Sequence, residues 1–167
     1  GLKEKEYIVM TLHRPANVDE AHKLKVLLDE IIAHSKGLPL VFPVHPRTAK
    51  VLENSGVNHP RLHLIEPLGY LEFNFLVERA KAVVTDSGGI TEETTVMGVP
   101  CLTLRDNTER PETITEGTNE LIGTNPKAIA PAMERLFACH WKLGSIPAKW
   151  DGHTAERIID ILTTLHV

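Results

Sequence analysis

The chain has 167 residues, 42% of them hydrophobic and 24% charged, and its formal net charge is −4. This length allows one compact domain with a sizeable core, and the acidic balance argues against a broad nucleic-acid-binding face. No apolar run is long enough to span a bilayer and no secretory signal is recognisable, so we expect neither a nucleic acid nor a membrane as partner.

Six short apolar runs alternate with segments of helical period along the chain. The segment from 19 to 35 carries Leu and Ile side chains on one stripe, with Asp19 as its candidate N-cap. Gly98 stands where the helix before it has to end. In chain order, we expect strands at 7–13, 38–45, 62–66, 81–86, 101–104 and 119–123. We expect helices at 19–35, 47–54, 70–80, 89–97, 125–139 and 154–166, and a helical turn at 111–116.

This alternation predicts an α/β fold. Residues 1–167 are expected to form a single Rossmann-like domain, with a mostly parallel sheet of about six strands and helices on both faces. In such sheets ligands bind outside the carboxyl ends of the strands. Polar residues gather at those predicted ends, at His13, His45, Glu66 and the pair Asp86-Ser87. We therefore expect the functional site at this edge of the sheet.

The stretch from Thr85 to Gly98 joins a strand end to the start of a helix. The first N–H groups of a helix lack internal partners and suit a phosphate, so Ser87, Gly88 and Gly89 are candidates for binding one. Glu92 or Glu93, in the first turns, can accept hydrogen bonds from ribose hydroxyls. The alternative is an ordinary helix start, with a Ser cap and acids that favour the helix dipole.

Histidines and arginines stand at other strand ends. His13 and Arg14 follow the first strand and can contact a diphosphate, and a histidine can also transfer a proton. Arg105 and Arg110 lie in the polar loop after the fifth strand, and either can clamp an anion. The alternatives are a surface loop at His13 and salt bridges of the two loop arginines with Asp106 or Glu109.

Metal and cofactor sites are disfavoured. His59 and His63 are four residues apart, but the proline between them makes a helical ligand pair doubtful, and HExxH and CxxC motifs are absent. The glycine motifs of nicotinamide and Walker-type nucleotide binding are also absent. Two cysteines far apart indicate a reducing compartment and a cytoplasmic location, with Cys101 as a buried small hydrophobe. Trp141 and Trp150 are expected to be packing residues.

Seven motifs between residues 10 and 162 match, in their order and spacing, those of a known protein family. They are LHRPAN, PVHPRT, EPLGYLEF, VTDSGGITEE, GVPCLTLRDNTERPE, GTNELIGTN and WDGHTAERI. Together they resemble the C-terminal half of the non-hydrolysing UDP-N-acetylglucosamine 2-epimerases. The resemblance implies one half of a GT-B-like two-domain enzyme, with the active site in the cleft between two Rossmann-like domains.

The resemblance also implies an activity. This family interconverts UDP-GlcNAc and UDP-ManNAc by eliminating UDP and adding it back, with no cofactor and no metal, and its members are commonly homodimers. The C-terminal domain holds UDP, which assigns Ser87, Gly88 and Gly89 to the diphosphate and Glu93 to the ribose. Phe73, or its backbone, is assigned to the uracil.

The remaining assignments from the resemblance concern the first strand end and its surroundings. His13 and Arg110 are expected near the diphosphate, where they help the leaving group carry its charge, with His13 also able to act as an acid or base. Arg14 and His45 match positions that line a second, regulatory UDP-GlcNAc site. Ala16 stands where the family usually has Glu, which removes one carboxylate near the cleft.

The acids that move the C2 proton lie, by the same resemblance, in an N-terminal domain that this chain lacks. We therefore expect the chain to be cut from a longer protein, to need that domain as a partner, and to be inactive by itself. Three alternatives stay open from the sequence. They are a hydrolysing UDP-GlcNAc 2-epimerase, a GT-B glycosyltransferase domain, and a stand-alone UDP-sugar-binding module.

Overall fold

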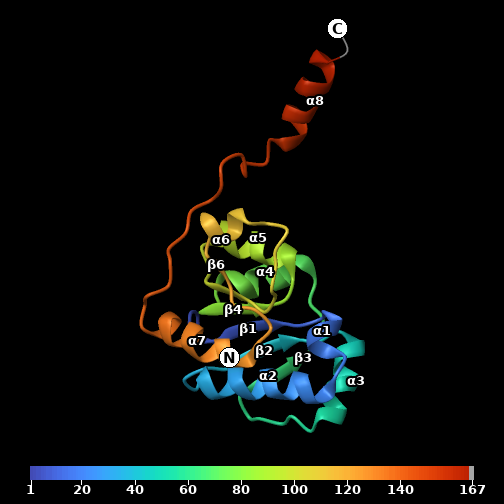
Figure 1. Cartoon of the computed structure of the whole chain (residues 1–167), viewed down its shortest axis with the longest axis vertical. Helices are drawn as coiled ribbons and strands as arrows, with labels where there is room; N and C mark the ends of the chain where they lie inside the picture. The colour runs from blue at the N-terminus through green and yellow to red at the C-terminus, as the bar shows by residue number, and fades with distance from the viewer. Residues whose placement is uncertain (166–167) are drawn as a thin grey trace.

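The computed structural model describes residues 1–165, with residue 47 described in its backbone only. Its strands form one six-stranded sheet in the order β3-β2-β1-β4-β5-β6, and every pairing is parallel (Figure 1). The strands are β1 (Ile8–Thr11), β2 (Leu40–Pro43), β3 (Leu62–Ile65), β4 (Ala82–Thr85), β5 (Cys101–Thr103) and β6 (Asn119–Leu121). Each lies within a predicted strand. The order reverses between β1 and β4, which is the switch point where ligands bind in such sheets.

Helices cover both faces of this sheet, as predicted. They are α1 (Pro15–Val18), α2 (Ala21–His34), α3 (Pro46–Ser55), α4 (Tyr70–Glu78), α5 (Gly88–Met97), α6 (Glu112–Thr115), the 3₁₀ helix η1 (Pro126–Ala128), α7 (Ile129–Phe137) and α8 (Thr154–Thr164). In Figure 1, α2, α3 and α7 lie below the sheet, and α4, α5 and α6 lie above it.

The core is split into two layers by the alternation of side chains along the strands. In β1, Ile8 and Met10 join the larger hydrophobic cluster, which includes Leu24 and Leu28 of α2. Val9, between them, joins the smaller cluster on the other face. Because both faces are covered, the strands are apolar throughout rather than alternating with polar residues.

Two predicted helix boundaries were wrong. Asp19 is not the N-cap of α2, because Pro15 at the first helical position starts a separate turn, α1, whose C-cap is Asp19. The N-cap of α2 is Glu20. The predicted helix 125–139 divides into η1 and α7, where the Asn125 side chain accepts a hydrogen bond from the Lys127 N–H. The last predicted helix is α8, and its expected end at residue 166 lies outside the described residues.

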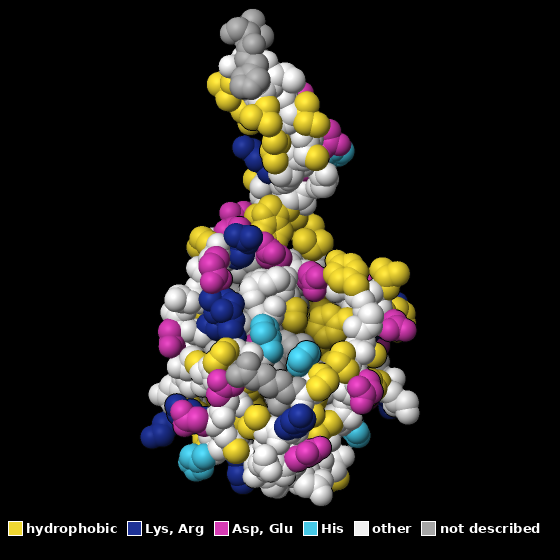
Figure 2. Space-filling model, turned by 90° about the vertical axis from the view of Figure 1, so that its right-hand side faces the viewer, with side chains coloured by type: hydrophobic (Ala, Val, Ile, Leu, Met, Phe, Trp, Pro, Cys, Tyr) yellow, Lys and Arg dark blue, Asp and Glu magenta, His cyan; other side chains and the backbone are white. Residues whose placement is uncertain are grey.

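Helix α8 extends away from the rest of the molecule (Figure 1). Within the described residues it buries none of its side chains. Ile158, Ile159, Ile161 and Leu162 are each more than half exposed, and hydrophobic side chains cover much of this helix in Figure 2. No helix in residues 1–165 combines the length and the apolar character needed to cross a membrane.

Gly98 ends α5 as predicted, in the left-handed conformation with φ of 67°. A Cβ built there meets no heavy atom of the described structure within 4 Å, so substitution costs backbone strain alone. We expect Gly98→Ala to lower the free energy of unfolding by about 1 kcal/mol, measured by urea denaturation. Gly89→Ala, with equal space and no positive φ, is the control and is expected not to destabilise. Equal losses in both variants would contradict this account of the helix end.

Candidate functional site

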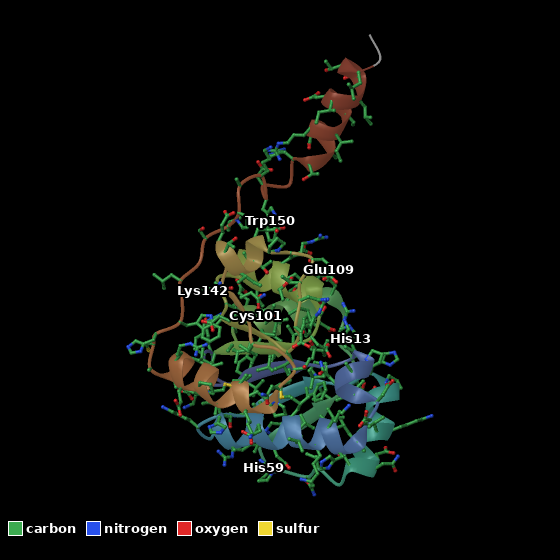
Figure 3. The ribbon with its side chains drawn as sticks, viewed as in Figure 1. His13, His59, Cys101, Glu109, Lys142 and Trp150 are labelled. Atoms are coloured by element: carbon green, nitrogen blue, oxygen red, sulfur yellow. The ribbon has the colours of Figure 1, made fainter. Side chains whose placement is uncertain are left out.

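A cavity of about 460 Å³ opens at the carboxyl ends of β1 and β4. Its lining comes from three segments that are distant in sequence: His13, Arg14, Ser87, Gly88, Gly89, Glu92, Glu109 and Arg110. Figure 2 faces this edge of the sheet and shows histidine side chains in a central hollow, with basic and acidic side chains around it. Figure 3 places His13 and Glu109 on this same side of the molecule. The structure thus brings together six of the nine predicted site residues.

The start of α5 forms one wall of this cavity. Ser87 occupies the N-cap with an extended backbone, and in the described structure its side chain makes no cap hydrogen bond. Its N–H donates to the Thr85 hydroxyl at 3.0 Å. The alternative prediction of a Ser cap is therefore right about the position of Ser87, but its side chain makes no capping hydrogen bond within the described residues. Ser87 lines the cavity beside the first N–H groups of the helix, which have no intrahelical partners.

Asp86 fixes the opposite wall. This residue is fully buried, and its carboxylate accepts hydrogen bonds from the backbone N–H groups of His13 and Arg14, at 3.1 and 3.0 Å. The Asn17 side chain donates to the same carboxylate at 3.0 Å and also to the Leu104 carbonyl at 3.1 Å. Asp86 therefore ties the loop after β1, and α1 with it, to the end of β4.

The same carboxylate orients the imidazole of His13. Nδ1 of His13 lies 3.0 Å from Oδ1 of Asp86, so Nδ1 carries a proton and Nε2 is left for other partners. Burial by itself raises the pKa of Asp86, but hydrogen bonds from His13, Asn17 and Arg14 outweigh it and the pKa lies below its ordinary value. Asp86 is therefore an anion at neutral pH, and its charge is stabilised by the hydrogen bonds that it accepts from these three residues.

The two arginines of the loop after β5 are each paired with a glutamate. Arg105 is nearly buried and donates two hydrogen bonds to Glu109, at 3.0 and 2.7 Å. This pair confirms the salt-bridge alternative for Arg105, and it lowers the pKa of Glu109 to about 2. Arg110 donates through Nε to Glu92. Arg110 is the more exposed of the two and lines the cavity directly.

A second cavity, of about 330 Å³, continues along α5. Its lining residues are Tyr70, Glu92, Glu93, Val96, Met97 and Trp150. Burial, and then the charge of Glu92, raise the pKa of Glu93, while a hydrogen bond with Tyr70 lowers it. Glu92 borders both cavities, so the two adjoin along α5, and we refer to them together as the groove over α5.

Two predicted site residues, Phe73 and His45, line neither of these cavities, and nor does Ala16. Phe73 is half-buried and packs against the smaller core cluster. His45 is exposed and follows β2, the strand beside β1, whereas its proposed companion Arg14 lines the larger cavity. Ala16 is exposed on α1 and borders a different cavity, together with His22, Lys23 and Asp106.

Other residues have structural roles. Nδ1 of His59 accepts a hydrogen bond from the Arg61 N–H at 3.2 Å, and Figure 3 shows His59 at the lower end of the molecule, away from His13 and Glu109. Cys101 is buried, as predicted, and burial raises its pKa to about 11. Trp141 is a packing residue, as predicted, and its Nε1 donates to the Thr118 carbonyl at 2.8 Å. In residues 1–165 no three His, Cys, Asp or Glu side chains converge as metal ligands do.

The sequence matches the family described as UDP-N-acetylglucosamine 2-epimerase over residues 1–163. The chain belongs to this family. A UDP-N-acetylglucosamine 2-epimerase of Methanocaldococcus jannaschii is 40% identical over 167 residues, which cover 95% of this chain and 44% of the relative. A UDP-2,3-diacetamido-2,3-dideoxy-D-glucuronate 2-epimerase of Pseudomonas aeruginosa is 40% identical over 118 residues, covering 70% of this chain and 33% of the relative.

Solved structures of the epimerase family share the fold. The M. jannaschii UDP-GlcNAc 2-epimerase in complex with UDP-GlcNAc and UDP superposes with a TM-score of 0.79 and 39% identity, covering 95% of this chain and 45% of that one. An E. coli heptosyltransferase with ADP, 12% identical with a TM-score of 0.55, shares the fold alone, over 85% of this chain and 46% of its own. The chain spans less than half the length of these epimerases, which confirms the prediction of one half of a GT-B-like enzyme.

Several residues of the site were missing from the sequence prediction. From the sequence, Asp86 was only the residue at the end of a strand. Its hydrogen-bond partners lie about seventy residues away in the sequence, so no local pattern predicts them. The pairing of Arg110 with Glu92 joins the loop after β5 to helix α5 and was not foreseen either. A signal for Asp86 does exist, because an acid directly after a strand that is buried on both faces has little access to water and needs donors nearby.

Proposed function

We propose that this chain is the UDP-binding half of a UDP-N-acetylglucosamine 2-epimerase. One observation supports this most: the groove over α5 starts at uncapped N–H groups and reaches carboxylates one turn later. Ser87, Gly88 and Gly89 would bind the diphosphate, since helix N-termini favour anions. Glu93 would accept hydrogen bonds from the ribose, and it stands about 6 Å further along the helix axis than Gly89.

The proposed reaction interconverts UDP-GlcNAc and UDP-ManNAc by eliminating UDP and adding it back, as in the non-hydrolysing enzymes. His13, held by Asp86 through Nδ1, presents Nε2 toward the cavity and would stabilise or protonate the leaving diphosphate. Arg110 would add positive charge once it leaves Glu92. Phe73 remains our proposal for the uracil, and Arg14 with His45 for a second, regulatory UDP-GlcNAc site.

The catalytic acids would come from the rest of the epimerase. The chain spans 44% of the M. jannaschii relative, and the apolar side chains of α8 are exposed to solvent in the described structure. We propose that residues 1–167 form one domain, that the missing N-terminal half covers α8 and completes the cleft, and that the isolated chain binds UDP without turnover. The two free thiols support a cytoplasmic location. We also propose a homodimer for the full-length protein.

Calorimetry of UDP binding to this chain, with UMP and ADP as controls, tests the proposal. We expect UDP to bind, UMP to bind more weakly because it lacks the second phosphate, and ADP not to bind. Equal binding of UDP and ADP would indicate a glycosyltransferase-like site that recognises the phosphates but does not distinguish the bases. Absence of UDP binding at millimolar concentration would contradict a nucleotide site carried by this half.

Glu93→Gln is expected to weaken UDP binding by about 1.5–3 kcal/mol, the scale of hydrogen bonds to a charged group. The amide keeps the shape of Glu93 but removes the charge that strengthens its bonds to the ribose hydroxyls. Calorimetry with UDP and with inorganic pyrophosphate measures the effect, and pyrophosphate affinity is expected to stay unchanged. Glu134→Gln, an exposed acid on α7, is the control. Unchanged UDP affinity in Glu93→Gln would remove Glu93 from the ribose role.

A further inference from the structure

Trp150 lies at the junction between the body of the molecule and α8 (Figure 3). It is half-buried and lines the 330 Å³ cavity opposite residues of α5, among them Glu93 and Met97. The other tryptophan, Trp141, is 9% exposed and hydrogen-bonded within the core. The two tryptophans thus have different surroundings. Trp141 borders a cavity of about 210 Å³ without acidic residues, whereas Trp150 lines the cavity that contains Glu92 and Glu93.

The turn that carries Trp150 is held by specific contacts. The Trp150 N–H donates to the Pro147 carbonyl at 3.2 Å, and Pro147 is itself buried. Arg157 donates through both terminal nitrogens to the Asp151 carboxylate, which also accepts from the His153 N–H at 3.1 Å. Such a bidentate pair has a fixed geometry. The indole is therefore presented by a defined turn at the start of α8 rather than by a loose tail.

The chemistry of this cavity fits a nucleoside. It contains a carboxylate at Glu93 for sugar hydroxyls, aliphatic surface at Val96 and Met97, and the aromatic rings of Tyr70 and Trp150. It adjoins the cavity at the start of α5, because Glu92 borders both. Val96 stands about 10 Å further along the helix axis than Gly89, a separation that suits a base at one end of a nucleoside diphosphate and its phosphates at the other.

We propose that Trp150 is a binding and specificity residue for the nucleoside half of a nucleoside diphosphate. Its indole forms the outer wall of the cavity, and the turn from Pro147 to Arg157 holds it there. The proposal rests on the proposed function, and it adds the start of α8 to a site otherwise built at the ends of β1 and β4.

Calorimetry with two ligands, UDP and inorganic pyrophosphate, tests this role. We expect Trp150→Ala to weaken UDP binding about tenfold, the order of one lost stacking contact, and to leave pyrophosphate affinity within about twofold of wild type. Trp150→Phe is expected to retain most of the affinity for UDP. Leu143→Ala, on the same C-terminal segment and 91% exposed, is the control variant and is expected to bind both ligands normally.

Intrinsic fluorescence gives a second measurement that does not depend on the alanine variant. UDP is expected to change the emission of the wild-type chain but not that of Trp150→Phe, in which only Trp141 remains. An equal response of both proteins would overturn the proposal, as would equal weakening of UDP and pyrophosphate binding in Trp150→Ala, or no weakening at all. A wild-type chain that binds neither ligand would overturn the proposed function, and the role of Trp150 with it.

Discussion

Asp86→Asn is expected to lower the free energy of unfolding by roughly 3 kcal/mol, the scale for removing one charge of a buried hydrogen-bonded pair. The carboxylate accepts hydrogen bonds from His13, Arg14 and Asn17, and all of its surface is buried. The NH₂ group of the asparagine would take the place of one carboxylate oxygen. The donors that bonded to that oxygen would then be left without an acceptor. Urea denaturation measures the loss.

The pH dependence of stability gives this prediction a second readout. The pKa of Asp86 is lower in the folded chain than its ordinary value of 3.8. At a pH below 3.8, the Asp86 carboxylate is therefore protonated more readily in the unfolded chain than in the folded one. The contribution of Asp86 is therefore fully present above that value and is lost as pH falls through the folded pKa. Asp86→Asn is expected to lose less stability on acidification than wild type. Glu134→Gln, on exposed α7, is expected to stay within about 0.5 kcal/mol of wild type.

Most of the fold could be predicted from the sequence, because strands buried on both faces are continuous apolar runs. Val9 and Met10 face opposite layers, yet both are fully buried, so β1 is recognisable without alternation. Only α1 was missed. It has four residues, too few for a helical period, and Asp19 after it resembled an N-cap although it ends one helix instead of starting the next.

The candidate site was predictable only where the chemistry is local. The Ser-Gly-Gly stretch and the glutamates that follow it lie in one helix start, so their spacing alone located them along the groove. Contacts between distant segments were not predictable. Trp150 joins the cavity from a segment about sixty residues beyond Glu92, and from the sequence we expected it to be a packing residue.

The electrostatics of the groove also became visible only in three dimensions. Arg105 and Arg110 face the start of α5, but each carries a glutamate as its partner. Glu92 and Glu109 both line the cavity in which we propose that a diphosphate binds. Arg105 has little freedom, because it is nearly buried and is bound by Glu109 through both oxygens. Arg110 is half exposed, so it is the arginine that can exchange a carboxylate for a phosphate.

Arg110→Ala is therefore expected to weaken UDP binding by about 10- to 100-fold, since hydrogen bonds to charged groups contribute about 1.5–3 kcal/mol. Glu92→Gln is expected to act in the opposite direction and to tighten binding by up to about fivefold, because an exposed ion pair is worth about 1 kcal/mol at most. The amide also removes a negative charge from the lining of the cavity. Calorimetry with UDP measures both variants.

Arg135 and Glu120 provide the matched control, because they form the same kind of ion pair away from the groove. Arg135→Ala and Glu120→Gln are expected to leave UDP affinity unchanged. In the double variant Arg110→Ala with Glu92→Gln, the gain from Glu92→Gln is expected to shrink, because the release of Arg110 no longer contributes and only the removal of a negative charge remains. If Glu92→Gln instead weakened UDP binding as strongly as Glu93→Gln, Glu92 would be the glutamate that binds the ribose, and Arg110 would be the group that holds it in place.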